Sequence, residues 1–188
     1  MKERVDSKTL GGLLRALPEK IKQTPIKVAD LKTSSGKELD LFMMDFNAKD
    51  IPPGIILDFT DLHLQAASFY HMTLDNYLFC GADLSNANFM KCSFKGTNFS
   101  GSKERATMLT DTSFLDGSLM DAIIDNRTNL LCAKLDKVIC PQFWLDVQAR
   151  QETRAQNIRV RTEFREREKI SYANLVSSNK NKAGCIIS

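Results

Sequence analysis

Large apolar residues recur every five positions through the middle of this chain, and such an internal repeat constrains the fold more than any other feature. Stepping by five from Phe59 to Ile124, thirteen of the fourteen positions are Leu, Ile or Phe, and Glu104 is the exception. The thirteen are Phe59, Leu64, Phe69, Leu74, Phe79, Leu84, Phe89, Phe94, Phe99, Leu109, Phe114, Leu119 and Ile124. We predict that these residues form the core of the repeat.

The residue two places before each large one is mostly small, as in the stretch GADLS NANFM KCSFK GTNFS over residues 81–100. A small partner is expected where the interior is narrow, because a larger side chain there would overpack it. Early in the repeat this place is taken by larger residues, namely Leu57, Leu62, Met72 and Tyr77. The first coil is therefore predicted to be wider or irregular.

A five-residue period fits neither an α-helix, which repeats every 3.6 residues, nor a simple strand, which repeats every two. It fits a chain that turns a corner once per unit, with one large and one small side chain pointing inward. Four sides make a coil of about 20 residues, and stacked coils would share backbone hydrogen bonds at about 4.8 Å. The expected columns are Phe59, Phe79, Phe99 and Leu119, and Leu74, Phe94 and Phe114.

This pattern resembles the pentapeptide-repeat family, whose consensus is A(D/N)LXX, over residues 55–140 and most specifically over residues 79–99. The resemblance implies an all-β solenoid, a right-handed quadrilateral β-helix of about four turns. Around Glu104 we expect one side to bulge outward, with Lys103, Glu104 and Arg105 in water. Family members often pair through their ends, so the resemblance also allows a homodimer.

The segments that flank the repeat are expected to cap it, because an open solenoid end exposes strand edges. Residues 1–54 are the predicted N-terminal capping segment, with a short helix over residues 8–23 and a strand over residues 37–46. Pro52-Pro53-Gly54 predicts a turn into the repeat.

On the other side, residues 141–169 are the predicted C-terminal capping helix, which begins at Pro141. Phe143, Trp144 and Val147 are expected to plug the open end of the coil. Residues 170–188 are polar and poor in aromatics, which predicts a flexible tail.

Composition excludes several classes of protein. No stretch approaches the roughly 18 apolar residues of a transmembrane helix, and the N-terminus lacks the apolar region of a secretory signal. The cysteines are Cys80, Cys92, Cys132, Cys140 and Cys185. This odd number, without a CxxC pair, favours a reducing compartment such as the cytoplasm.

No catalytic set is evident, which predicts a binding protein without cofactor rather than an enzyme. None of the patterns HExxH, GxSxG, Walker or GxGxxG is present. Cys80 and His71 would be a nucleophile and a base only if they met, and the repeat places them on different sides of the coil. The aspartates are scattered, so no metal site is expected.

Charge argues against a nucleic-acid partner and against mimicry of one. Residues 51–140 carry 7 basic and 10 acidic groups, a net charge of only −3, within a chain of net +3. Some pentapeptide-repeat proteins mimic DNA with a long acidic rod and inhibit type II topoisomerases, which is our alternative interpretation. The basic residues near the C-terminus are not interleaved with aromatics, so direct nucleic-acid binding is not expected.

Arg150, Arg154, Arg161 and Arg165 fall close together on one face of the C-terminal helix at about 100° per residue. Two interpretations stay open. The face is simply solvated, with charge pairs along the helix, or it meets anionic lipid or an acidic partner.

The last four residues, Cys185, Ile186, Ile187 and Ser188, resemble a CaaX prenylation box, in which a terminal Ser usually specifies farnesyl. Lys180 and Lys182 precede the box and add positive charge, which anionic membranes attract. One lipid gives only marginal anchoring, so a second signal is needed. The box implies a prenyl transferase as partner, and a prenyl-binding carrier protein as a further one.

The leading hypothesis is a non-enzymatic protein-binding scaffold that prenylation of Cys185 delivers to the cytoplasmic face of a host-cell membrane. Without the lipid the protein would be cytoplasmic. Pentapeptide repeats are mostly bacterial and prenyl transferases are eukaryotic, so the combination resembles an effector that an intracellular bacterium injects.

Overall fold

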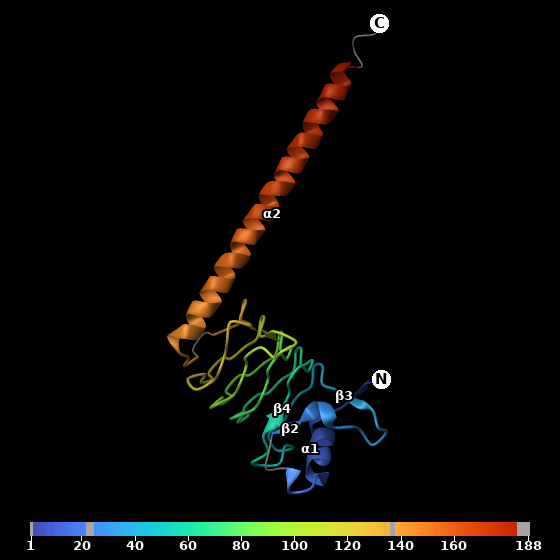
Figure 1. The fold of residues 1–188 in the computed structure, drawn as a ribbon, viewed down its shortest axis with the longest axis vertical. Helices are drawn as coiled ribbons and strands as arrows, with labels where there is room; N and C mark the ends of the chain where they lie inside the picture. Colours follow the sequence, from blue (N-terminus) through green and yellow to red (C-terminus); the bar gives the residue numbers. More distant parts are fainter. Residues whose placement is uncertain (1, 22–24, 136–137, 184–188) are drawn as a thin grey trace. The chain divides into compact units, whose positions relative to one another are not determined.

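The computed structural model describes residues 2–21, 25–135 and 138–183 (Figure 1). The chain divides into two compact units, Met1–Ala149 and Arg150–Ser188. The first unit contains β1 (Lys2–Arg4), α1 (Ser7–Ala16), β2 (Ile26–Lys27), the 3-10 helix η2 (Val28–Asp30), β3 (Glu38–Asp40), β4 (Leu57–Asp58), β5 (Thr107–Met108) and β6 (Thr128–Asn129). Helix α2 (Gln142–Ala183) begins in the first unit and makes up the described part of the second.

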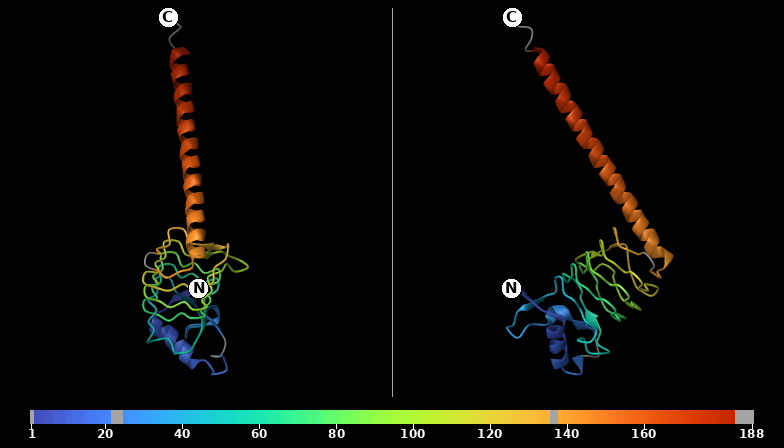
Figure 2. Two further views of the ribbon diagram at one scale, coloured as in Figure 1. Left: turned by 90° about the vertical axis from the view of Figure 1, so that its left-hand side faces the viewer. Right: turned by 180° about the vertical axis from the view of Figure 1, so that it is seen from behind.

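The repeat region winds in stacked coils that parallel backbone bridges join on each side (Figure 2). In the first coils each bridge joins residues 20 apart, as in Asp58–Leu78 and Leu78–Asn98. The named strands are two or three residues long and pair two at a time rather than in one continuous sheet. Successive bridges start at residues 58, 63, 68, 73 and 78, so the sequence period of five is the distance along the chain from one side to the next.

Several corners between two bridges combine an Asp or Asn cap with a left-handed backbone. Asn88 Oδ1 accepts a hydrogen bond from the N–H of Met90 at 3.0 Å, and Asn98 Oδ1 accepts one from Ser100 at 2.9 Å. Residues with positive φ recur every five positions, at Asp61, Ala66, His71, Asn76, Gly81, Asn86, Lys91 and Gly96. The Asp or Asn of the repeat therefore stabilises the turn by the side-chain hydrogen bond that these residues commonly make.

The large residue of each repeat points into the coil. Twelve of the thirteen core positions are buried, and Ile124, on the last coil, is partly buried. Phenylalanine rings stack from coil to coil, with centroids 5.1 Å apart for Phe59–Phe79 and 5.3 Å apart for Phe79–Phe99. A second column contains Phe46, Phe69, Phe89 and Phe114, with centroid distances of 4.3, 4.7 and 5.3 Å.

The small inward positions tolerate a hydroxyl because the backbone supplies an acceptor. Thr97, Thr112 and Thr128 are each no more than 1% exposed. Their Oγ atoms donate to the carbonyls of Leu74, Leu84 and Phe99 at 2.7, 2.8 and 2.9 Å. A buried hydroxyl that is hydrogen-bonded avoids most of the cost of losing water.

Beyond residue 100 the predicted columns of stacked side chains are wrong, because each residue lies one side of the coil away from its expected place. From Asp83–Met108 to Asn98–Ile123 the bridges join residues 25 apart, because one pentapeptide leaves the stack. Phe114 therefore stacks on Phe89 rather than on Phe94, and the bridge Ser93–Ser118 puts Leu119 next to Phe94 rather than Phe99. The five-residue pattern continues on both sides of this excursion. The sequence alone therefore does not reveal that the pentapeptide in between forms no side of a coil.

The stack continues below residue 55 into the N-terminal segment. Phe46 begins the second phenylalanine column, and Asp45 forms a parallel bridge with Ser68. Strand β2 pairs in parallel with β4, and β1 pairs in parallel with β3. The strand expected over residues 37–46 is limited to β3 at Glu38–Asp40, because the chain turns a corner directly afterwards.

Helix α1 packs against this end of the first unit. Asp6 caps it, accepting a hydrogen bond from the N–H of Thr9 at 2.8 Å, which lowers the pKa of the Asp6 carboxyl. The helix ends at Ala16, before Pro18, and so is shorter than the predicted span of residues 8–23. Leu10 and Leu14 are fully buried, and Arg15 Nη2 donates to the carbonyl oxygen of Asp50 at 2.8 Å.

At the other end of the first unit, Trp144 covers the last coil. Its ring lies edge-on to Phe99 and Phe114, with centroids 6.1 Å away from each. Trp144 and Val147 are buried, but Phe143, which was expected in the same plug, is 51% exposed because it lies on another side of the helix. Gln148 Nε2 donates to the carbonyl oxygen of Ala133 at 2.6 Å and fixes this first part of α2.

Helix α2 also runs past Lys169, where the sequence predicted its end, and continues to Ala183. Residues 170–183 are therefore helical rather than a flexible tail. A low content of aromatics does not prevent a helix, and neither Pro nor Gly occurs between Pro141 and Gly184 to interrupt it. Residues 184–188 lie outside the described residues.

The close packing of α1 predicts opposite effects for two neighbouring glycines. A Cβ at Gly11 would lie 2.1 Å from the carbonyl oxygen of Asp50, whereas a Cβ at Gly12 would meet nothing within 4 Å. We expect Gly11→Ala to lower the free energy of unfolding by more than about 1 kcal/mol. Gly12→Ala should raise it by up to about 1 kcal/mol, because Ala is the better helix former.

Urea unfolding of both variants, followed by circular dichroism, measures this difference. Equal effects of the two substitutions would contradict the close contact between α1 and Asp50.

Candidate functional site

The outer surface of the coil carries mixed, mostly uncharged side chains. The four sets of bridge residues that flank the buried centres are Asp58, Leu78, Asn98 and Ile123; His63, Asp83, Met108 and Asn129; Asp45, Ser68, Asn88, Ser113 and Lys134; and Thr73, Ser93, Ser118 and Ile139. No set has more than one carboxylate. A continuous acidic face, which a DNA mimic requires, is therefore not formed by the bridge residues of the described coils.

The excursion at residues 101–106 folds back onto the first coil. Ser102 Oγ donates to Asp61 Oδ1 at 2.6 Å, Arg105 Nε lies 3.7 Å from the same oxygen, and Arg105 Nη1 lies 3.3 Å from His63 Nε2. Lys103 and Glu104 are exposed as expected, but Arg105 is only 37% exposed. The expectation for Arg105 was wrong because its partners are more than 40 residues away in the sequence.

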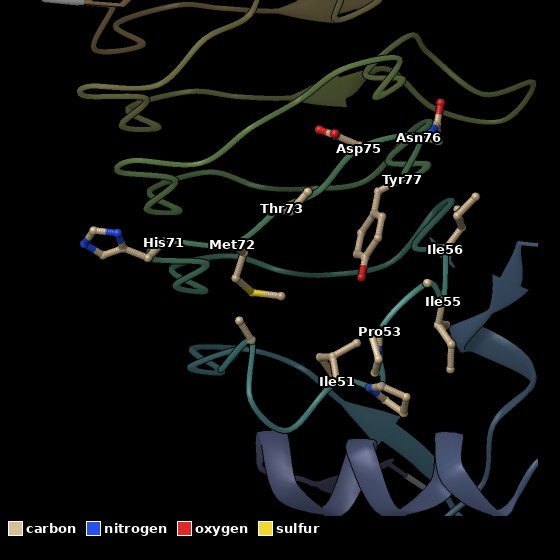
Figure 3. Close-up of a pocket in the computed structure, with 13 residues that line it drawn as sticks. Ile51, Pro53, Ile55, Ile56, His71, Met72, Thr73, Asp75, Asn76 and Tyr77 are labelled. Atoms are coloured by element: carbon tan, nitrogen blue, oxygen red, sulfur yellow. The ribbon is translucent and has the colours of Figure 1, made fainter.

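A hollow of about 480 Å³ lies between the first coil and the segment that enters it (Figure 3). The coil contributes residues 71–73 and 75–77 to its lining, and residues 48 and 51–56 contribute the opposite wall. Met72 and Tyr77 point into it from small inward positions of the repeat. Both are oversized for that place. The wider or irregular first coil that they predict is not seen in the backbone pairing, because all four bridges from the first coil to the next join residues 20 apart.

Tyr77 is 4% exposed, and its hydroxyl points into the hollow toward Pro53 (Figure 3). Burial raises the pKa of Tyr77 to about 12, so the phenol keeps its proton at physiological pH and is a hydrogen-bond donor. No side chain or backbone group among the described residues bonds this hydroxyl. Because no buried side-chain oxygen there lacks a partner, the hydroxyl itself must reach the solvent in the hollow.

Cys80 and His71 do not form a nucleophile and base pair. The carbonyl oxygen of Cys80 accepts from Asp61, and the N–H of His71 donates to Met90, so the two residues occupy different corners of the coil. Burial raises the pKa of the Cys80 thiol, and the carboxylates of Asp58 and Asp125 raise it further. These effects disfavour the thiolate, which is the nucleophilic form.

Neither a metal site nor a membrane span is found in the part of the chain that the structure describes. No group of three or more His, Cys, Asp or Glu side chains there could hold a metal ion. No helix there is both long and apolar enough to cross a membrane.

The second unit carries the arginines that the sequence singled out. Arg150, Arg154, Arg161 and Arg165 are exposed, and over residues 150–167 they share a face about 60° wide at about 100° per residue. Glu152, Glu163 and Glu166 project from the opposite side of this helix. Arg159 pairs with Glu163 at 3.3 Å and Lys169 with Glu166 at 2.8 Å.

Cys185, Ile186, Ile187 and Ser188 lie outside the described residues, and Lys180 and Lys182 belong to α2 without described side chains.

Comparison with known proteins agrees with the repeat geometry. Residues 67–103 match the family model "Pentapeptide repeats", in eight copies. This part of the chain is therefore similar to pentapeptide repeats. No curated protein matches the chain in sequence. Pentapeptide-repeat proteins are generally non-enzymatic structural or binding proteins.

Two solved pentapeptide-repeat proteins from cyanobacteria are similar to the chain. HetL of Nostoc sp. strain PCC 7120, which is involved in the regulation of heterocyst differentiation, is 21% identical over 64% of this chain, with a TM-score of 0.23. A protein from Cyanothece 51142 is 15% identical over 55% of this chain, with a TM-score of 0.11. The alignments span 48% and 58% of those proteins, so this chain matches only about half of their length.

The pKa shift of Cys80 predicts slow alkylation. At pH 7.5 we expect iodoacetamide to modify Cys132, which is exposed, well before Cys80, because less of the Cys80 thiol is ionised. Raising the pH should narrow the difference, since a raised pKa moves thiolate formation to higher pH. Peptide mass analysis over time distinguishes the sites, and preferential labelling of Cys80 would contradict the burial described.

Proposed function

We propose that this chain is a non-enzymatic protein-binding scaffold that prenylation of Cys185 holds at the cytoplasmic face of a host-cell membrane. The observation that carries the proposal is the pairing of a pentapeptide-repeat segment with the Cys-Ile-Ile-Ser sequence. The repeat supports a rigid surface, because every side of a coil is tied to the next by backbone hydrogen bonds. The Cys-Ile-Ile-Ser sequence supports farnesylation.

In this proposal the stacked coils form a right-handed, four-sided β-helix of about four turns, as the family resemblance implies. Parallel bridges on each of the four sides support it. The corners add support, because left-handed residues recur at every fifth position of the first coils.

Attachment of the lipid requires a prenyl transferase as the first partner. The proposal also includes a prenyl-binding carrier protein and a protein target. A bacterial type of repeat with a eukaryotic type of lipidation signal supports an effector that acts inside a host cell. Pairing of two copies through the coil ends, which the family resemblance allows, stays a prediction.

The arginine face supplies the second membrane signal that a single lipid requires. Arg154, Arg161 and Arg165 form no ion pair within the described part of the chain. Each basic residue near an anionic leaflet adds about 1 kcal/mol. Three arginines therefore contribute about 3 kcal/mol, enough to change membrane affinity about a hundredfold.

Expression in eukaryotic cells tests the anchor directly. The chain with Ser188 as its last residue should gain the mass of a farnesyl group and sediment with membranes, whereas Cys185→Ser should show neither property. Cys132→Ser is the matched control, because it removes an exposed cysteine outside the motif. An unmodified, soluble wild-type protein would reject the anchor.

The arginine face has its own test. Arg154→Gln/Arg161→Gln/Arg165→Gln should weaken binding of the lipidated protein to vesicles containing phosphatidylserine about a hundredfold, and added salt should reduce the difference. The control Arg159→Gln/Arg167→Gln/Lys169→Gln removes the same charge from other faces. Equal losses in the two triple variants would show that only net charge matters and would exclude the face as a membrane signal.

A further inference from the structure

Two sides of the first coil have no backbone partner below them. The N-terminal segment continues the pairing on the sides of Asp58 and Ser68, through Ile26 with Ile56 and Ser68 with Met44, both at 2.9 Å. His63 and Thr73 pair upward only, through their bridges to Asp83 and Ser93, and of these two the hollow is lined by Thr73. Among the backbone hydrogen bonds of the described residues, none uses the N–H or the carbonyl of Thr73.

The sequence explains why no strand pairs with the open edge of Thr73. The segment that would lie beneath Thr73 contains Pro52 and Pro53, which have no N–H to donate. Gly54 follows with a φ of +76°, which turns the chain away instead of extending it. The chain therefore passes the edge at a distance, and the hollow of about 480 Å³ lies where a strand would otherwise be.

The hollow has the features of a binding site and not only of an exposed edge. In an extended chain alternate residues face opposite edges, so the N–H and the carbonyl of Thr73 both face the open one. The Tyr77 hydroxyl points into the same space and can donate to a ligand there in place of water. Met72, Ile51 and Ile55 provide apolar lining.

We propose that an extended segment of a partner protein adds to this edge as a strand. Its backbone pairs with the N–H and carbonyl of Thr73, one of its carbonyls accepts from the Tyr77 hydroxyl, and an apolar side chain fills the space beside Met72. Addition of a peptide to an unpaired strand edge is an established mode of recognition. The proposal deepens the scaffold function and rests on it, by naming how and where the target binds.

The lining also indicates which segments fit. Asp75 is its single carboxylate, and the lining contains no Lys or Arg. Asp75 Oδ1 already accepts from the backbone N–H of Lys95 at 3.0 Å and from the Ser93 hydroxyl. The hollow therefore favours a neutral or basic segment over an acidic one, and it excludes Pro at the residue that pairs with Thr73, because that residue must donate an N–H.

The test uses the unlipidated full-length chain and a phage-displayed library of random dodecapeptides. We expect selection to enrich peptides that bind the wild-type protein and that bind Thr73→Pro at least tenfold more weakly. Proline suits an edge position whose N–H has no internal partner, so this variant should fold, and circular dichroism checks that it does. Tyr77→Phe should weaken the same peptides about five- to tenfold, through one lost hydrogen bond.

Synthetic copies of the enriched peptides distinguish strand addition from simple occupation of an apolar pocket. Two versions of each peptide are compared, one N-methylated at odd-numbered and the other at even-numbered residues. One version should lose binding and the other should bind nearly as before, since only alternate N–H groups face the edge. Binding should also slow hydrogen exchange at the Thr73 amide, which in the free protein should exchange faster than the paired amide of Ser93.

Three results would overturn the proposal: no enriched peptide, peptides that bind both protein variants as well as the wild type, or equal binding of the two methylation patterns. If Thr73→Pro does not fold, the proposal is tested by the peptide affinity of Tyr77→Phe and by the comparison of the two sets of N-methylated peptides. The peptide-binding edge and the lipid anchor can fail independently of each other. The peptide measurements need no lipid, and the Cys185→Ser experiment needs no peptide.

Discussion

Parallel pairing of each coil with the next is the interaction on which the rest of this protein depends. It holds equivalent residues of successive coils one strand spacing apart, about 4.8 Å. Side chains of one kind are thereby forced into columns, and flat rings fill such columns well, as the centroid distances of 4.3–5.3 Å in the two phenylalanine columns show. The same pairing leaves the interior narrow, so that mostly Ala, Thr or Cys accompanies the large residues of the later coils.

Much of this architecture could be predicted from the sequence, because the five-residue period reflects local chemistry. The buried Phe and Leu positions, the small partners and the polar turn residues all lie within one pentapeptide. The position of the excursion could also be predicted from Glu104. Its effect on the columns could not, because the side at which the chain re-enters the stack depends on contacts between distant residues.

The candidate sites were predictable to different degrees. Tyr77 and Met72 were recognisable as oversized for their positions, and Pro52-Pro53 predicted a turn. That these two features enclose one hollow depends on how the N-terminal segment passes the coil, which no local pattern encodes. Arg105 was misjudged for the same reason, since Asp61 and His63 approach it only after the coils have stacked.

The Trp144 plug has a consequence for assembly. Because successive coils pair in nearly the same way, the pairing itself does not limit the number of coils in a stack. An uncovered last coil would present its backbone to the first coil of another molecule. Such a head-to-tail contact does not close on itself, so it propagates into filaments. With Trp144 against Phe99 and Phe114 at one end, and α1 packed at the other, both ends carry a covering element, which disfavours such open-ended growth.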